Sequence, residues 1–256
     1  MIEKARHFAG YFYGEKTALM IKIEGAEGFS FVKEHFKPQA AITNRKRVFD
    51  GFFKVDELTI RTSTHDGGDM EVKRLIFERG HAVAILGYDP VSDEVLLVRE
   101  MHPGLLAVGE YPFIDTHPAG MIDEGEDALE AAAREFREET GAAIGNMKII
   151  HEGAYVSSGG TSEKITLVAG VVDMSTVIDG SIHGNRHEGE DIQVVVVKAR
   201  EFISRAQNGQ LHDMKSMVFA LWLAQQRPTR ARLVSARSRR SVPEAQELVE
   251  MGASHR

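Results

Sequence analysis

The sequence predicts an α+β or layered α/β domain preceded by a small antiparallel β domain. Two observations lead to this fold class. Short segments with strand-like patterns dominate residues 45–99, and amphipathic helices first alternate with strands further along the chain. The elements lack the regular strand–helix–strand alternation that builds a doubly wound parallel sheet. A chain of 256 residues is long enough for one large or two modest domains.

The amino-terminal β domain is expected over residues 1–80. Its first thirty residues have no sustained hydrophobic period, although Ala18–Ile23 is a candidate short strand. Further strands are expected at Arg47–Val55, Glu57–Thr62 and Met70–Phe77. The sequence His-Asp-Gly-Gly-Asp at residues 65–69 predicts the turn before the last of them.

The second domain is expected over residues 81–226. A β-hairpin begins it, because two apolar strands flank the turn-forming sequence Asp-Pro-Val-Ser-Asp at residues 89–93. The predicted strands are His81–Tyr88, Glu94–Arg99, Lys148–Val156, Lys164–Val172 and Ile192–Lys198. The predicted helices are Ala128–Thr140, Glu201–Asn208 and Met214–Gln226.

Composition excludes several kinds of site. The chain has no cysteine, which rules out disulfides, thiolate zinc sites, iron–sulfur clusters and cysteine nucleophiles. Its longest apolar run, Met217–Ala224, is too short to span a bilayer, and residues 1–10 lack a signal-peptide pattern, so a cytoplasmic protein without membrane contact is expected. The net charge of −7 is compatible with binding cations and argues against a role in coating nucleic acid.

A basic tail is expected over residues 227–256. Residues 227–240 contain six arginines and no acidic residue. This segment is interpreted as a solvated tail, with a patch for an anionic partner as the alternative. Ser241 to Glu244 has capping-box spacing with proline in the first turn, which predicts the start of a short helix.

The chemistry-bearing segment is residues 120–142, GMIDEGEDALEAAAREFREETGA. Asp127 and Glu130 form a capping-box pair at the start of the predicted helix, and Gly141 follows its end, where a left-handed residue is common. An apolar stripe is expected along one side of the helix, made of Leu129, Ala133, Phe136 and Thr140.

Three carboxylates are expected on the opposite side of this helix. Glu135, Glu138 and Glu139 have i, i+3, i+4 spacing, so their charges repel unless protons or cations intervene. Oxygen-only ligands favour a hard cation, Mg²⁺ or Mn²⁺. A solvated glutamate-rich face is the alternative, but it would not also require the loop glycine Gly120 and the separate Glu126.

This segment resembles the Nudix box, GX5EX7REUXEEXGU, in which U is an apolar residue. The seven residues that match its fixed positions are Gly120, Glu126, Arg134, Glu135, Glu138, Glu139 and Gly141. The resemblance implies a layered α-β-α Nudix fold and a metal-dependent hydrolase of nucleoside diphosphates linked to another group. It also implies Mg²⁺ as cofactor, with Mn²⁺ able to substitute. The metal ligands would be the Ala119 carbonyl, Glu135, Glu138 and Glu139, with Arg134 and Glu126 structural.

Outside the box the chain is similar to the bacterial ADP-ribose pyrophosphatases, over segments 72–82, 157–163, 182–192 and 209–216. This resemblance implies a homodimer acting on a nucleoside diphosphate sugar. Glu188 would be the general base, supported by Glu138, and Glu190 a further metal ligand. The substrate-binding residues implied are Arg74, Arg79, Gly159 and Glu163.

The chain departs from this family's pattern at two positions. Thr116, with Asp115 beside it, stands where the family usually has glutamate four residues before the box glycine. The family commonly has a proline in the loop after the box, and Ser158 is the residue of this chain nearest to that position. These departures affect the choice of substrate more than the class of reaction.

The leading hypothesis is hydrolysis of ADP-ribose to AMP and ribose 5-phosphate. The alternatives are a hydrolase of another nucleoside diphosphate sugar, such as GDP-mannose, and a non-catalytic Nudix nucleotide sensor. A zinc site at His183 and His187 is disfavoured, because the sequence offers no evident third ligand.

Overall fold

The computed structural model describes residues 39–227, which form two compact units. One unit comprises residues up to Asp50 together with Val55–Leu75, and the other comprises Gly51–Lys54 and the residues from Ile76 onward. Three predictions lie outside the described residues: the strand Ala18–Ile23, the basic tail beyond Arg227 and the helix start at residues 241–244.

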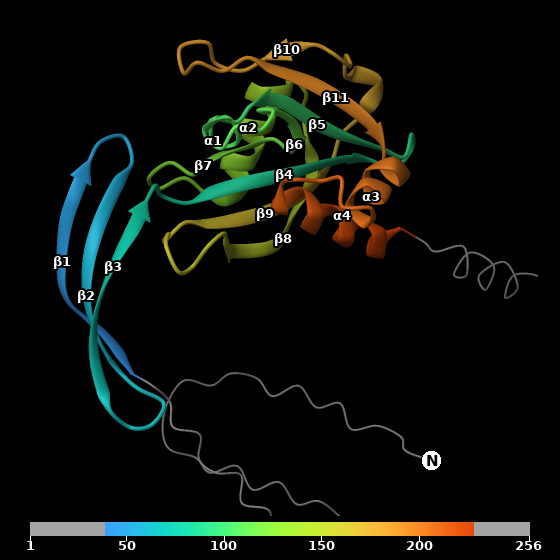
Figure 1. Cartoon of the computed structure of the whole chain (residues 1–256). Coiled ribbons are helices and arrows are strands. Elements are labelled where there is room, and N and C mark those ends of the chain that lie inside the picture. Colours follow the sequence, from blue (N-terminus) through green and yellow to red (C-terminus); the bar gives the residue numbers. More distant parts are fainter. Residues whose placement is uncertain (1–38, 228–256) are drawn as a thin grey trace, which may run out of the picture. The chain divides into compact units, whose positions relative to one another are not determined.

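The first unit is built on a three-stranded sheet in the order β1-β2-β3 (Figure 1). Its strands are β1 (Ala40–Asp50), β2 (Lys54–Ser63) and β3 (Asp69–Glu78). The predicted single strand Arg47–Val55 is wrong, because the chain turns between β1 and β2 at residues 51–53. The Asp50–Gly51 pair, a frequent hairpin-turn sequence, marks this reversal.

The second unit contains an eight-stranded mixed sheet. Its main order is β10-β11-β5-β4-β9-β8, with β6 paired to β5 and β7 paired to β4. Neighbouring strands are antiparallel except for β4 and β9, which run parallel. The strands are β4 (Ala82–Asp89), β5 (Glu94–Met101), β6 (Phe113–Thr116), β7 (Ala119–Met121), β8 (Gly145–Tyr155), β9 (Lys164–Val171), β10 (Ile182–His183) and β11 (Ile192–Lys198).

Helices cover both faces of this sheet (Figure 1). The helices are α1 (Pro103–Ala107), α2 (Ala128–Thr140), α3 (Ala199–Gln207) and α4 (Met214–Gln226), with a short 3-10 helix at Met174–Thr176. The expected layered α-β-α arrangement is therefore confirmed. Within residues 39–227, no helix has the length and apolar character needed to cross a bilayer.

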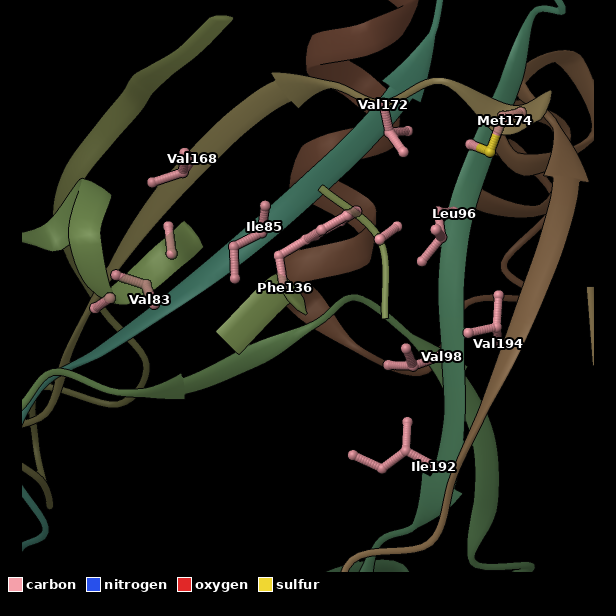
Figure 2. Packing of buried hydrophobic residues seen from close by; sticks show 13 residues of the cluster. Val83, Ile85, Leu96, Val98, Phe136, Val168, Val172, Met174, Ile192 and Val194 are labelled. Atoms are coloured by element: carbon pink, nitrogen blue, oxygen red, sulfur yellow. The ribbon is translucent and has the colours of Figure 1, made fainter. Parts of the chain in front are cut away.

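The core beneath α2 centres on Phe136. Figure 2 shows this ring among side chains of β4 and β5, including Ile85 and Leu96. Gly87 on β4 makes room for it, because a Cβ there would lie 2.7 Å from the Phe136 ring. Alternate residues of β4 and β5 thus face α2, as the two-residue period of a strand requires.

The opposite face packs against α3 and α4. Leu86 of β4 and Leu97 of β5 meet Phe202 of α3 and Phe219 of α4 in a second buried cluster. The predicted strands and helices of this unit are confirmed to within about three residues at their ends, and α2, α4 and β11 match their predicted bounds. The short elements α1, β6, β7 and β10 had no counterpart in the prediction.

His117 is a buried polar side chain in this second core. It is 1% exposed, and its ring lies 5.2 Å from that of Phe202 and 4.6 Å from that of Phe219. Its Nδ1 lies 3.0 Å from Ser216 Oγ, while its Nε2 has no hydrogen-bond partner among the described residues. Burial lowers the pKa of His117 to about 3.

This depressed pKa predicts a loss of stability in mild acid. The unfolded chain binds a proton near pH 6.5 and the folded chain only near 3, so unfolding takes up a proton in between and stability falls as pH drops. Between pH 7.5 and 5.5, His117 should cost about 1.4 kcal/mol. Urea denaturation at the two pH values measures this. His117→Gln should lack that part of the pH dependence, and an equal dependence in both proteins would refute the assignment.

Candidate active site

Helix α2 has the ends that its sequence predicts. The Asp127 side chain accepts a hydrogen bond from Leu129 N at 2.8 Å, and Glu130 Oε2 accepts one from Asp127 N at 3.4 Å, which completes the capping box. At the other end Gly141 adopts φ +68° and its N–H bonds to Arg137 O. Local interactions therefore set both ends of the helix that carries the three box glutamates.

Arg134 connects the helix to the loop before it. Its guanidinium donates two hydrogen bonds of 2.9 Å to Glu126, one of 2.8 Å to Glu135 and one of 3.1 Å to Met121 O. It also lies 3.5 Å from Glu138, as the i, i+4 spacing predicts. The hydrogen bonds from Arg134 lower the pKa of Glu126. Arg134 and Glu126 thus have the geometry of a structural pair.

Gly120 allows Glu135 to lie against the backbone of β7. A Cβ at this position would be 2.0 Å from the Glu135 carboxyl carbon, so no other residue leaves room for that carboxylate. Glycine is therefore required at the first position of the box because a side chain there would clash. Backbone conformation does not require it, since the φ of Gly120 is not in the left-handed region.

Glu139 is buried, which corrects the expectation that it lies with Glu138 on the side away from the apolar stripe. It is only 4% exposed, and its Oε2 accepts a hydrogen bond from Ala119 N at 3.3 Å. Glu138, by contrast, has a side chain that is 52% exposed. Glu139 is therefore at the boundary between the apolar core and the carboxylate side of α2.

The charges of three other carboxylates, from β5, α2 and the loop before β11, affect the pKa of Glu139. Burial, followed by the charges of Glu100, Glu135 and Glu190, raises the pKa of Glu139 well above its ordinary value. The pKa values of Glu135 and Glu100 are also raised, in each case first by burial. We refer to these residues as the carboxylate cluster: Glu100, Glu135, Glu139 and Glu190.

Two candidate carboxylates lie between β10 and β11, in residues 184–191, which we call the late loop, and they differ in position. Glu190 belongs to the carboxylate cluster, and its Oε2 accepts a hydrogen bond from Asn185 N at 2.8 Å. Glu188 is exposed, and its Oε1 accepts a hydrogen bond of 2.7 Å from Asn185 Nδ2. The structure thus brings Glu190, but not Glu188, toward the box glutamates.

The start of the late loop contacts the last turn of α2. Gly184 N donates to Glu138 O at 3.2 Å. The His183 ring packs so closely on Gly141 that a Cβ there would lie 2.4 Å from it. The second box glycine is therefore needed for its left-handed backbone and also for this contact.

A second group of predicted residues gathers where β3 meets the loop after β8. Phe77 N donates to Gly160 O at 2.8 Å, and Thr161 Oγ1 donates to Phe77 O at 2.9 Å. This pairing sets Arg79 Nε 3.5 Å from Oε1 of the buried Glu163. The Arg79 guanidinium also lies over the Phe53 ring, 5.1 Å from its centre.

The other predicted substrate residues are solvent-facing. Gly159 is exposed, with open space around its Cα, in the loop that contains Glu163. Arg74 belongs to the first unit, where it is exposed on β3 and donates to Lys73 O at 2.8 Å. Arg79 Nε, in contrast, is buried and has no hydrogen-bond partner among the described residues.

Asp115 does not supply the carboxylate that is missing at Thr116. It accepts a 2.7 Å hydrogen bond from Arg99 and a 3.3 Å hydrogen bond from Arg205 of α3. Thr116 itself is buried opposite Val98 of β5. Asp115 therefore stabilises the face of the sheet that packs on α3.

The carboxylate cluster fits a divalent cation by its chemistry. Buried, mutually repelling carboxylates are stabilised when a cation neutralises them, and oxygen donors select Mg²⁺ or Mn²⁺. Within residues 39–227, no three His, Asp or Glu side chains already stand close enough to hold an ion. Some of these side chains would therefore have to move closer together to share one cation.

Glu100 is the member of the cluster that the sequence prediction missed. It lies outside the box, on β5, and the predicted strand ended one residue before it. The available signal was strand periodicity, since Glu100 follows Leu96 and Val98 on the face that α2 covers.

Comparisons with known proteins bear on the family and the fold of the chain. The NUDIX domain model matches residues 78–216. The chain is 36% identical over 188 residues to the ADP-ribose pyrophosphatase of Escherichia coli K12, covering 73% of this chain and 88% of that protein. It is 29% identical to the GDP-mannose pyrophosphatase of Pectobacterium atrosepticum, covering 69% and 90%. A solved structure described as an ADP compounds hydrolase has a TM-score of 0.54 and 22% identity, covering 73% and 96%.

Proposed function

Because the chain belongs to the Nudix family, we propose that it is a Mg²⁺-dependent pyrophosphatase that hydrolyses ADP-ribose to AMP and ribose 5-phosphate. The observation that supports this most directly is the carboxylate cluster beside the Ala119 backbone. The names of its relatives support a nucleoside diphosphate sugar as substrate.

The proposed metal ligands are Glu135, Glu139, Glu190 and the Ala119 carbonyl, with Glu138 sharing one cation from the exposed edge of α2. Bound cations neutralise the charge of a diphosphate and lower the pKa of a coordinated water. Arg134 fixes the orientation of Glu135 through the 2.8 Å hydrogen bond, so the ligand does not have to be ordered when the substrate arrives.

The proposed reaction is attack of water on one phosphorus of the diphosphate. The new P–O bond forms as the bridging P–O bond breaks, and the leaving phosphate takes the electron pair. Glu188 accepts the proton of the attacking water in this scheme. Because Glu188 now faces solvent and is bonded to Asn185, the late loop must rearrange before it can act.

Arg79 is the proposed contact for the negatively charged substrate, since its side chain is 37% exposed while its buried Nε faces Glu163. Glu163 Oε1 lies 3.5 Å from this Nε and so orients the guanidinium. The open loop around Gly159 is proposed to form a further part of this substrate site.

A substrate panel tests this function. Purified protein is incubated with ADP-ribose, GDP-mannose, NADH or diadenosine polyphosphates, with Mg²⁺ or with EDTA, and products are separated by chromatography. AMP and ribose 5-phosphate in equal amounts, formed from ADP-ribose only with Mg²⁺, are expected. Faster release of GMP from GDP-mannose would favour the alternative, a hydrolase of GDP-mannose. A relative named GDP-mannose pyrophosphatase supports this alternative. Binding of nucleotides without turnover of any of them would indicate a sensor.

Glu188→Gln tests the proposed base. Turnover should fall about 100-fold or more, because general-base catalysis contributes on this scale. Mn²⁺ affinity, measured by calorimetry, should stay near the wild-type value, since Glu188 lies outside the carboxylate cluster. His187→Gln is the matched control in the same exposed loop. Unchanged turnover of Glu188→Gln would remove Glu188 from the mechanism.

We further propose that the protein acts as a cytoplasmic homodimer. The segment around α1 exposes Leu106, Val108 and Tyr111, each more than half exposed, and a second copy could cover such apolar side chains. Light scattering after size exclusion should give twice the chain mass of 28.4 kDa. A monomeric mass at working concentrations would contradict the dimer.

A further inference from the structure

Strand β5 extends beyond the core into the active site. Leu96 and Val98 are completely buried in the cluster beneath α2. Successive strand residues alternate between faces, so Glu100 projects on the same face, two residues further along. Its neighbour Arg99 projects to the other face, where it pairs with Asp115.

The adjacent strand delivers Glu190 to the same place. Val98 of β5 pairs with Val194 of β11, and both belong to the core beneath α2. Toward the loop end, β5 continues to Glu100 while β11 begins at Ile192, just after Glu190. The register thus places Glu100, near the end of β5, close to Glu190 of the loop that leads into β11. Burial and then the charge of Glu190 raise the pKa of Glu100, which agrees with this placement.

The charge of Glu100 is poorly neutralised by the side chains described around it. His102 Nε2 lies 3.9 Å from Glu100 Oε1, which is too far for a hydrogen bond. Lys215 reduces the repulsion on Glu100, but its ammonium is paired with Asp213 at 2.8 Å.

We propose that Glu100 is a direct ligand of the divalent cation, added to the Nudix box by strand β5. The proposal rests on the proposed function, since it assumes the same metal site. Glu100 has the donor atoms that Mg²⁺ and Mn²⁺ prefer. Its side chain is one-third exposed, which leaves it access to an ion entering from solvent.

Mn²⁺ binding to the full chain, followed by electron paramagnetic resonance without substrate, tests this role. Glu100→Gln removes the charge and keeps the shape, whereas Glu100→Asp keeps the charge and shortens the reach. A ligand requires both, so each variant should bind Mn²⁺ about 10-fold or more weakly. Glu110→Gln, which removes an exposed carboxylate from the loop after α1, should bind like wild type.

The following outcomes separate the possibilities. Wild-type affinity in Glu100→Gln overturns the proposal. Weaker binding in Glu100→Gln but not in Glu100→Asp also overturns it, because Glu100 would then act through its charge alone. Glu139→Gln is titrated alongside: if wild type itself binds no Mn²⁺, the proposed function fails, whereas loss in Glu139→Gln alone leaves that function standing and rejects Glu100 as a ligand. Circular dichroism confirms that each variant is folded.

Discussion

Glu139→Gln is expected to lower kcat by about 1000-fold or more. Glu139 is the most buried member of the carboxylate cluster, and removal of a metal ligand forfeits several kcal/mol of charge stabilisation. Each 1.36 kcal/mol corresponds to about a factor of ten in rate. Product release from ADP-ribose at saturating Mg²⁺ measures the loss.

The same substitution should stabilise the metal-free protein. The pKa of Glu139 is raised in the folded state, so folding disfavours its charged form at neutral pH, and a neutral glutamine avoids that cost. Thermal unfolding in EDTA should therefore show a higher Tm for Glu139→Gln than for wild type. Glu138→Gln, on the half-exposed edge of the helix, is the control and should leave Tm nearly unchanged. A lower Tm for Glu139→Gln than for wild type would show that the charge of Glu139 does not destabilise the metal-free protein.

Phe136→Ala is expected to destabilise the protein by about 3–5 kcal/mol. Removing a fully buried aromatic ring costs its transfer free energy and leaves a cavity. Figure 2 shows that the ring is surrounded by side chains from the sheet, and Gly87 provides no side chain that could fill the space. Urea unfolding measures the change.

Phe136→Leu provides the graded comparison. It retains most of the apolar volume and should cost clearly less than Phe136→Ala. Because α2 also carries Glu135 and Glu139, activity should fall at temperatures where the alanine variant unfolds, and return on cooling. A cost below about 1.5 kcal/mol would mean that the core can close around the missing ring.

The sequence predicted elements well where local interactions determine them. The bounds of α2 follow from a capping box at Asp127 and a left-handed glycine at Gly141, both readable within a few residues. Strands β4 and β9 were also found, because both are buried on two faces and have continuous apolar sequences.

Elements that depend on distant partners were missed. Strands β6 and β7 have only four and three residues, and they exist because they pair with β5 and β4. A pattern of that length has no period to detect. The strand predicted at Arg47–Val55 is wrong for a different reason, because the turn sequence at Asp50–Gly51 interrupts it.

The site shows the same division. Helix spacing accounts for the position of Arg134 beside Glu138, whereas the structural role of Arg134 and Glu126 was implied by the resemblance to the Nudix box. Spacing could not show that Glu139 faces the core, because its angle on the helix lies between the polar and apolar sides. It also could not find Glu100, whose relation to α2 arises from the pairing of β5 with β11.

The late loop is held at its start by the last turn of α2, and this attachment affects how readily a base on the loop can be replaced. With Gly184 bonded to Glu138 O and Ile192 fixed in β11, the chain that carries Glu188 is a tether of only a few residues. A group on so short a tether is present at an effective concentration of about millimolar or higher throughout its motion. A base carried there is not replaced by dilute carboxylates from solution, so chemical rescue of Glu188→Ala by formate should require concentrations far above those of ordinary buffers.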